Sequence, residues 1–261
     1  MNAGALAALT LFSLRRRLGG WRGLAGLAAA LFPSLLAVVF RSFAPLEQPE
    51  VPRPWEFYGE FLAPLSLYFV LPFVSMIVML PALGELYEKG AVGYLLTRPV
   101  SRTLPVLALS AGGFLATVPF LLVAAWLPGL LLQGLGGVSF SFWLERMVWL
   151  SLILALGAAT YGSLCVFLGV WSRRPFLWAL ALLFGLGSIA GSITGPLRDL
   201  SPHRYLFALL RDRLDLPNVW SEIMVPDPDP PDSLEALGML LLSAVLFQFL
   251  AARAIRRRDV L

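Results

Sequence analysis

Long apolar runs alternate with short polar segments along this chain, a pattern typical of a protein that crosses a membrane several times. Each run has about the 17–25 residues that a helix needs to span a bilayer. None contains lysine, arginine or histidine, and their only acid is Glu235, at the edge of the last run. The pattern predicts six transmembrane helices, at residues 23–40, 61–83, 104–127, 147–170, 176–195 and 234–252.

Composition excludes a soluble globule. The chain is 58% hydrophobic and 14% charged, and its mean hydropathy is +0.78. A soluble domain carries about 25% charged residues, so this chain lacks the polar surface to cover one. We expect an all-α integral membrane protein, a single domain over residues 1–261, embedded as a multi-pass protein in the inner (cytoplasmic) membrane of the cell.

Residues 6–18 precede the first span and have the pattern of a short amphipathic helix that ends in Arg15, Arg16 and Arg17. Such a helix lies in the membrane interface. The alternative is a frayed start of the first span. A cleavable signal peptide is not expected, because its positive charge would come before the apolar stretch.

Basic residues predict the orientation, since they gather on the cytoplasmic side of membrane proteins. With a cytoplasmic N-terminus and six spans, the inner segments hold 13 of the 20 basic residues and three of the 16 acids. Both termini are then cytoplasmic. The inner arginines suit anionic lipid headgroups, so nucleic acid is not an expected partner. The inner basic residues are Arg15, Arg16, Arg17, Arg22, Lys89, Arg98, Arg102, Arg173, Arg174, Arg253, Arg256, Arg257 and Arg258.

Residues that carry chemistry are scarce. The only histidine, His203, falls in an outer loop that the fourth span is not expected to reach, and Cys165 has no second cysteine to pair with. A metal site needs several converging ligands, and a proton-coupled carrier needs an acid or histidine at membrane depth. Lys89 is followed by Gly90, so the chain has no P-loop. We therefore expect no catalytic residue and no metal site.

The polar segment at residues 85–102, between the second and third spans, has the character of a short surface helix. Glu85 and Glu88 are three residues apart and share one helical face near the positive N-terminal end. Leucines form an apolar side, and a proline ends the helix near two arginines. An amphipathic connector anchored by arginines is the alternative interpretation. After the two acids, the residues that give the segment this character are Gly90, Gly93, Leu95, Leu96, Arg98, Pro99 and Arg102.

This segment resembles the first cytoplasmic loop of type-2 ABC transporter permeases. In that family the loop reads roughly Glu-x-Gly-Thr-Leu-x-x-Leu-Leu-Ser/Thr-x-Pro-Val/Ile-Ser/Thr-Arg and follows the second of six spans. Ala91 and Gly93 depart from the pattern, at positions where threonine and an acid are usual. The matching positions are Glu88, Gly90, Leu95, Leu96, Thr97, Pro99, Val100, Ser101 and Arg102.

The resemblance implies an exporter subunit whose residues 85–97 form a coupling helix that docks on a separate ATP-binding subunit. ATP and Mg²⁺ would then be bound by that partner, with no cofactor in this chain. It also implies a second permease copy, in a homodimer or a heterodimer. The alternatives from other classes are a membrane-embedded enzyme or assembly factor acting on lipids, and an immunity or sensor protein that transports nothing.

Two further segments have patterns that predict helix packing or a helix. Gly187, Gly191 and Gly195 lie four residues apart in the fifth span, a spacing that lets two helices approach closely. In the last outer segment, Ser201 and Pro202 mark a helix start, and leucines follow at helical spacing. We expect this second segment to be an interfacial helix.

Overall fold

The computed structural model describes residues 3–43, 52–80, 104–135, 138–172, 174–186, 199, 201–214 and 231–257. This part of the chain is 94% helical and has no strands. It contains five helices long and apolar enough to cross a membrane: Gly20–Phe43, Pro54–Met79, Val106–Leu135, Phe140–Trp171 and Ser233–Ile255. They coincide with five of the six predicted spans. The remaining span begins as the apolar helix Pro175–Phe184, and residues 187–195 lie outside the described part, so the count of six stays a prediction.

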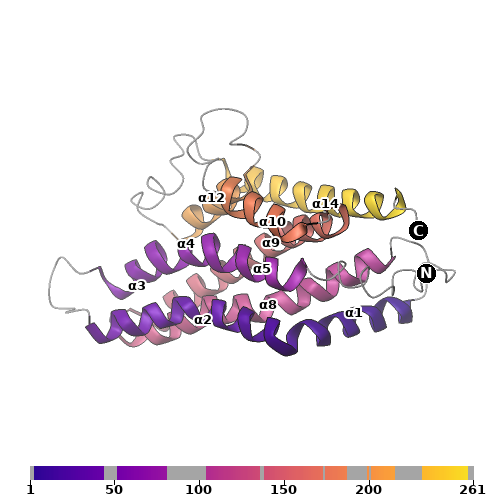
Figure 1. The fold of residues 1–261 in the computed structure, drawn as a ribbon. Coiled ribbons are helices and arrows are strands. Elements are labelled where there is room, and N and C mark those ends of the chain that lie inside the picture. The colour runs from indigo at the N-terminus through magenta and orange to yellow at the C-terminus, as the bar shows by residue number, and fades with distance from the viewer. Residues whose placement is uncertain are drawn as a thin grey trace.

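The first two helices, α1 (Ala3–Leu18) and α2 (Gly20–Phe43), run one after the other along α8 (Leu104–Leu132) (Figure 1). A break separates them at Gly20, whose φ of 76° is readily adopted only by glycine. Helix α1 is therefore a helix separate from α2, as the first of the two sequence-based alternatives predicts. Its placement in the membrane interface stays a prediction.

The second span mixes α and π turns. Pro64 and Pro72 lack an N–H, and the ring of each would clash with the carbonyl four residues earlier, at Glu60 and Tyr68. Both carbonyls fall in π-helical stretches, where the wider turn makes room for the ring. The span therefore stays continuous despite its prolines. Its segments are α3 (Pro54–Glu56), η1 (Phe57–Leu62), α4 (Ala63–Leu65), η2 (Ser66–Val70) and α5 (Leu71–Met79).

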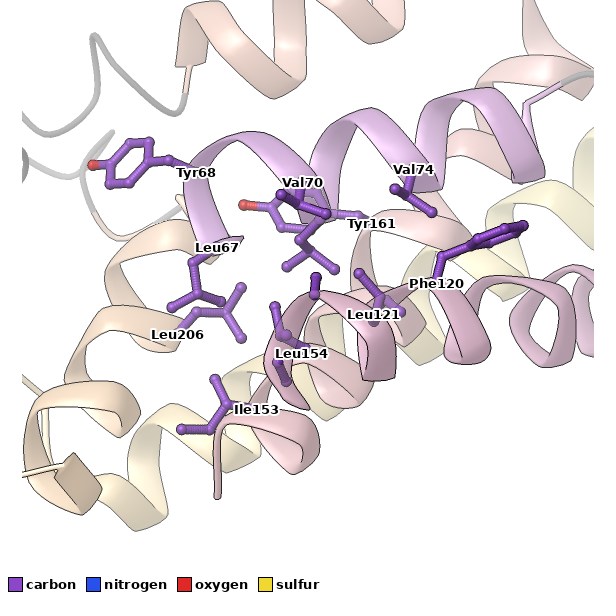
Figure 2. Packing of buried hydrophobic residues seen from close by; sticks show 14 of the residues in the cluster. Leu67, Tyr68, Val70, Val74, Phe120, Leu121, Ile153, Leu154, Tyr161 and Leu206 are labelled. Atoms are coloured by element: carbon purple, nitrogen blue, oxygen red, sulfur yellow. The ribbon is translucent and has the colours of Figure 1, made fainter. Parts of the chain in front are cut away.

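Helix α9 (Phe140–Trp171) is the central helix of the bundle, and α14 (Ser233–Arg257) lies at its edge. In the most apolar window of each helix, 72% of α9 is buried but only 17% of α14. Figure 2 shows Leu154 and Tyr161 of α9 among side chains from the second span, α8 and α12. The exposed face of α14 is apolar, so it must face lipid or another subunit.

The antiparallel helices give the bundle two ends. The start of α1, the start of α8 and the end of α14 lie together, and we call this the terminal end; α5 runs toward it but ends short of it (Figure 1). At the opposite, distal end, Arg41 of α2 donates to the carbonyl of Leu131 at 2.9 Å. The ring of Trp55 meets that of Phe142 edge-on there, with 6.3 Å between centroids.

Helix α12 (Pro202–Leu214) lies inside the bundle, against α9 and α14. All residues from 205 to 210 are buried, whereas an interfacial helix leaves one face to water. Its last residue reaches the distal end, where Arg146 donates to the carbonyl of Leu214 at 2.6 Å. The predicted helix is confirmed, but its predicted place at the interface is wrong, because helical periodicity reveals an apolar face and not how deeply the helix inserts.

Two further segments complete the described part. The short helix η3 (Gln133–Leu135) follows α8 at the distal end. Helix α10 (Pro175–Leu180) continues into the π turns of η4 (Ala181–Leu186) and packs on α9, where Trp171 and Trp178 meet edge-on with 6.2 Å between ring centroids.

Candidate functional site

The segment predicted to contact an ATP-binding subunit connects the end of α5 to the start of α8. Helix α5 runs toward the terminal end and stops short of it at Met79, beside Arg17 and Gly113, whereas α8 begins at that end with Leu104 (Figure 1). The connection between them therefore starts and finishes in the same half of the bundle. The predicted contact residues themselves lie outside the described part of the chain: Glu85, Glu88, Gly90, Gly93, Leu95, Leu96, Arg98, Pro99 and Arg102. The same holds for the packing glycines Gly187, Gly191 and Gly195.

Helix α1 braces both of these helix ends. Thr10 donates through Oγ1 to the carbonyl of Ala108, at 3.5 Å, near the start of α8. Arg17 is buried; its Nη1 lies 3.5 Å from the sulfur of Met79, the last residue of α5. The guanidinium fills the space above Gly113, where even one added Cβ would collide with it. A displacement of either helix end must therefore move α1 as well.

A buried polar cluster joins three elements inside the bundle. The hydroxyl of Tyr161, on α9, is hydrogen-bonded to Nδ1 of His203, at the start of α12. The ring of Tyr68, from the second span, lies over the histidine with 4.8 Å between centroids. Tyr161 is about 30 Å along α9 from Phe140 and about 15 Å from Trp171, at 1.5 Å per residue. The cluster is therefore far from both helix ends.

The structure corrects one expectation about His203: the fourth span does reach this histidine, through Tyr161. The histidine is buried in the bundle. Helix α12 is not one of the five spanning helices, and burial lowers the pKa of His203 to about 4, so the ring is neutral at neutral pH. Its Nε2 is buried without a hydrogen-bond partner among the described residues.

A second polar junction links α8, α9 and α14 nearer the terminal end. Ser110 donates to Oε1 of Gln248 at 3.1 Å, and Nε2 of Gln248 donates to Ser163 at 3.1 Å. One side-chain amide on α14 thus ties the bundle's edge helix to two of its neighbours. A shallow groove of about 440 Å³ runs over this junction, between Leu107 and Phe249.

The comparison with known families shows the family to which the chain belongs. A family model described as ABC-2 family transporter protein matches residues 14–190. The chain belongs to the ABC-2 transporter family. It is a multi-pass membrane protein and the membrane subunit of a transporter. A comparison with curated proteins found no match for the chain.

The ABC-2 match covers some described features and not others. It includes Arg17, the first four spans and the connection between α5 and α8. It ends before His203 and Gln248, so both polar junctions combine residues inside the match with residues beyond it. ABC-2 permeases typically work with an ATP-binding subunit. The match therefore includes the whole predicted docking segment but only part of each polar junction.

Sequence analysis did not predict which polar side chains of the spans meet. Tyr68, Tyr161 and Gln248 are among the few polar side chains of the predicted spans, and their positions in the sequence look scattered. In the structure of this chain the two tyrosines meet at His203, and the glutamine meets two serines. No local pattern signals this, because each meeting joins segments far apart in the chain.

A double-mutant cycle tests the Tyr161–His203 bond. Tyr161→Phe should lower the free energy of unfolding by about 1 kcal/mol, because it leaves a buried ring nitrogen without its partner. His203→Leu should cost a similar amount. The double variant should lose clearly less than the sum, measured by thermal unfolding in detergent. As a control, Tyr205→Phe removes a bond to the Asp199 backbone and should add to His203→Leu without coupling; additivity of Tyr161→Phe as well would contradict the assignment.

Proposed function

We propose that this chain is the permease half of an ATP-driven exporter and that residues 85–102 dock on a separate ATP-binding subunit. The observation that carries the proposal is the family match together with the position of the two helix ends that frame this segment. The segment contains Glu88 and Gly90 in the order typical of the family's coupling helix. ATP and Mg²⁺ bind to the partner, and this chain performs no covalent chemistry.

The distribution of charge supports a cytoplasmic terminal end. Arg15, Arg16 and Arg17 end α1, Arg174 precedes α10, and Arg253 lies in the last turns of α14. All lie in the half of the bundle toward the terminal end, which also holds the two ends of the connection between α5 and α8. Positive charge on the cytoplasmic side is the general rule for such proteins. This orientation exposes residues 85–102 to the compartment that contains ATP.

The contacts of α1 with α5 and α8 provide a path by which force is transmitted. When the ATP-binding subunits close, the docked segment shifts, and it pulls on Met79 at the end of α5 and Leu104 at the start of α8. The buried Arg17 carries the shift into α1. The second span can bend at its π turns, since widened turns weaken the regular backbone ladder. The spans then expose a cavity alternately to the two sides of the membrane or to the lipid.

A second copy of this chain or of a related permease completes the transporter. The faces of α2 and α14 are apolar and little buried, with 33% and 17% of their spanning windows covered. Either face offers the close packing of helices that drives association in a bilayer. A homodimer is the simpler arrangement, and a heterodimer is the alternative. The apolar interior of the spans favours a lipid-like or amphipathic cargo over a small ion.

Co-purification and labelling together test the proposal. The tagged chain, purified from its native host, should bring an ATP-binding cassette protein and its ATPase activity through purification. In a Cys165→Ala background, Ser101→Cys should react with a membrane-impermeant maleimide only from the cytoplasmic side. Ser139→Cys, which is exposed at the distal end, should react only from outside. Reversed labelling, or a chain that purifies without any ATPase, would refute the proposal.

A further inference from the structure

A cavity of about 610 Å³ opens on the side of the bundle between α9, α12 and α14. It is separate from the Tyr161–His203 cluster and from the terminal end. Two of its wall residues, Leu152 and Leu234, are 55% and 82% exposed, so the cavity opens on the side of the bundle rather than at an end. Its volume lies in the range of pockets that hold small organic molecules.

The cavity is polar at one end and apolar along the rest of its length. Arg213, Trp149 and Ser233 line the part nearest the distal end, where α12 finishes and α14 starts. Leu156 and Leu237 line the deeper part. From Trp149 to Leu156 the cavity follows α9 for about 10 Å, at 1.5 Å per residue. A phospholipid in one leaflet has the same order of polarity, with its headgroup at the surface and its chains toward the middle.

The cation at the polar end is held in place by its neighbours. The guanidinium carbon of Arg213 lies over the ring of Trp149, 4.5 Å from its centroid. The Nε of Arg213 is 3.4 Å from Oδ2 of Asp212, and Ser233 donates to the same carboxylate oxygen at 2.6 Å. Stacking fixes the plane of the guanidinium and leaves donors at its edge, an arrangement suited to a phosphate. The adjacent carboxylate suits the ammonium of a zwitterionic headgroup.

We propose that this cavity binds one phospholipid, with its phosphate at Arg213 and an acyl chain along Leu152, Leu156 and Leu237. The assignment to the outer leaflet rests on the orientation proposed above, whereas the site itself does not. A bound lipid covers apolar surface between α12 and α14 that the described residues leave open. It also contacts both α9 and the start of α14.

Native mass spectrometry of the purified full-length chain tests the site. After incubation with phosphatidylethanolamine, the wild-type chain should retain one lipid at least tenfold more than after incubation with diacylglycerol of the same chains. Arg213→Gln should reduce phosphatidylethanolamine retention about tenfold, because it removes the charged donors to the phosphate. Leu237→Trp should do the same by filling the apolar part of the cavity.

Two matched variants serve as controls. Arg211→Gln removes a cation from the same helix turn without touching the cavity, and Leu241→Trp adds an indole one turn further along α14 on an exposed position. Both should retain the lipid as the wild type does. Equal retention of diacylglycerol would overturn the phosphate assignment, and equal retention by Arg213→Gln and Arg211→Gln would overturn the site. All four variants should keep the ATP-binding subunit, so a failure here is distinguishable from a failure of the proposed function.

Discussion

A chain carrying Glu88→Arg and Gly90→Trp together will lose its ATP-binding subunit while remaining inserted in the membrane. The first change reverses a charge on the predicted docking face, and the second places an indole where the family pattern has a glycine. We expect the apparent affinity to fall at least about a hundredfold, which corresponds to about 3 kcal/mol. The measurement is quantitative co-purification at fixed detergent and salt, with thermal unfolding of the chain itself as the check on its fold.

The matched control makes the same two substitutions at the distal end. Glu145→Arg and Gly134→Trp alter exposed positions there, and a Cβ on Gly134 would meet no atom within 4 Å. This variant should keep its ATPase at the wild-type level. If the first variant also keeps its ATPase, residues 85–102 are not the docking segment and the proposed coupling is wrong.

Gly157→Leu will produce the largest loss of stability among the described glycines of the central helix. Gly157 faces Leu71 of α5 and Leu206 of α12, and an added Cβ would lie 3.1 Å from Cδ1 of Leu206 and closer still to the methyl of Leu71. A leucine has three further carbon atoms that this space cannot hold. Overpacking of this kind costs about 3 kcal/mol, so the unfolding temperature should drop by about 10 °C.

Gly238→Leu provides the comparison. Gly238 also lies inside a helix, α14, but a Cβ there would meet nothing within 4 Å. Its unfolding temperature should stay within about 2 °C of the wild type. Gly157→Ala should fall between the two, because a terminal methyl of Leu71 can move aside. An unchanged unfolding temperature for Gly157→Leu would mean that α5, α9 and α12 do not pack as the structure shows.

Packing at Gly157 also affects the Tyr161–His203 junction. His203 sits one turn before Leu206 on α12, so displacing α12 at Gly157 also disturbs the bond to Tyr161. Buried polar contacts between membrane helices contribute modestly, about 0.6 kcal/mol on average. Packing at Gly157 therefore dominates the stability of α12, while the histidine bond fixes its position along α9.

The candidate site could be predicted from sequence only in part. The segment at residues 85–102 stands out because it is polar between two apolar runs and carries the family pattern. The brace by Arg17 could not be foreseen, since an arginine at the end of an amphipathic helix ordinarily faces water or headgroups. Its burial depends on Gly113, nearly a hundred residues later, which leaves room for the guanidinium.

The sequence by itself determined the helical membrane fold, the approximate positions of five spans, and the family of the chain. These follow from local properties: the length of an apolar run, the placement of arginines and a short motif. Tertiary structure alone decided that α12 enters the bundle and that His203 meets Tyr161, 42 residues away in the chain. A helical pattern specifies which face is apolar, but the partner of that face depends on the shape of the space that all the other helices leave.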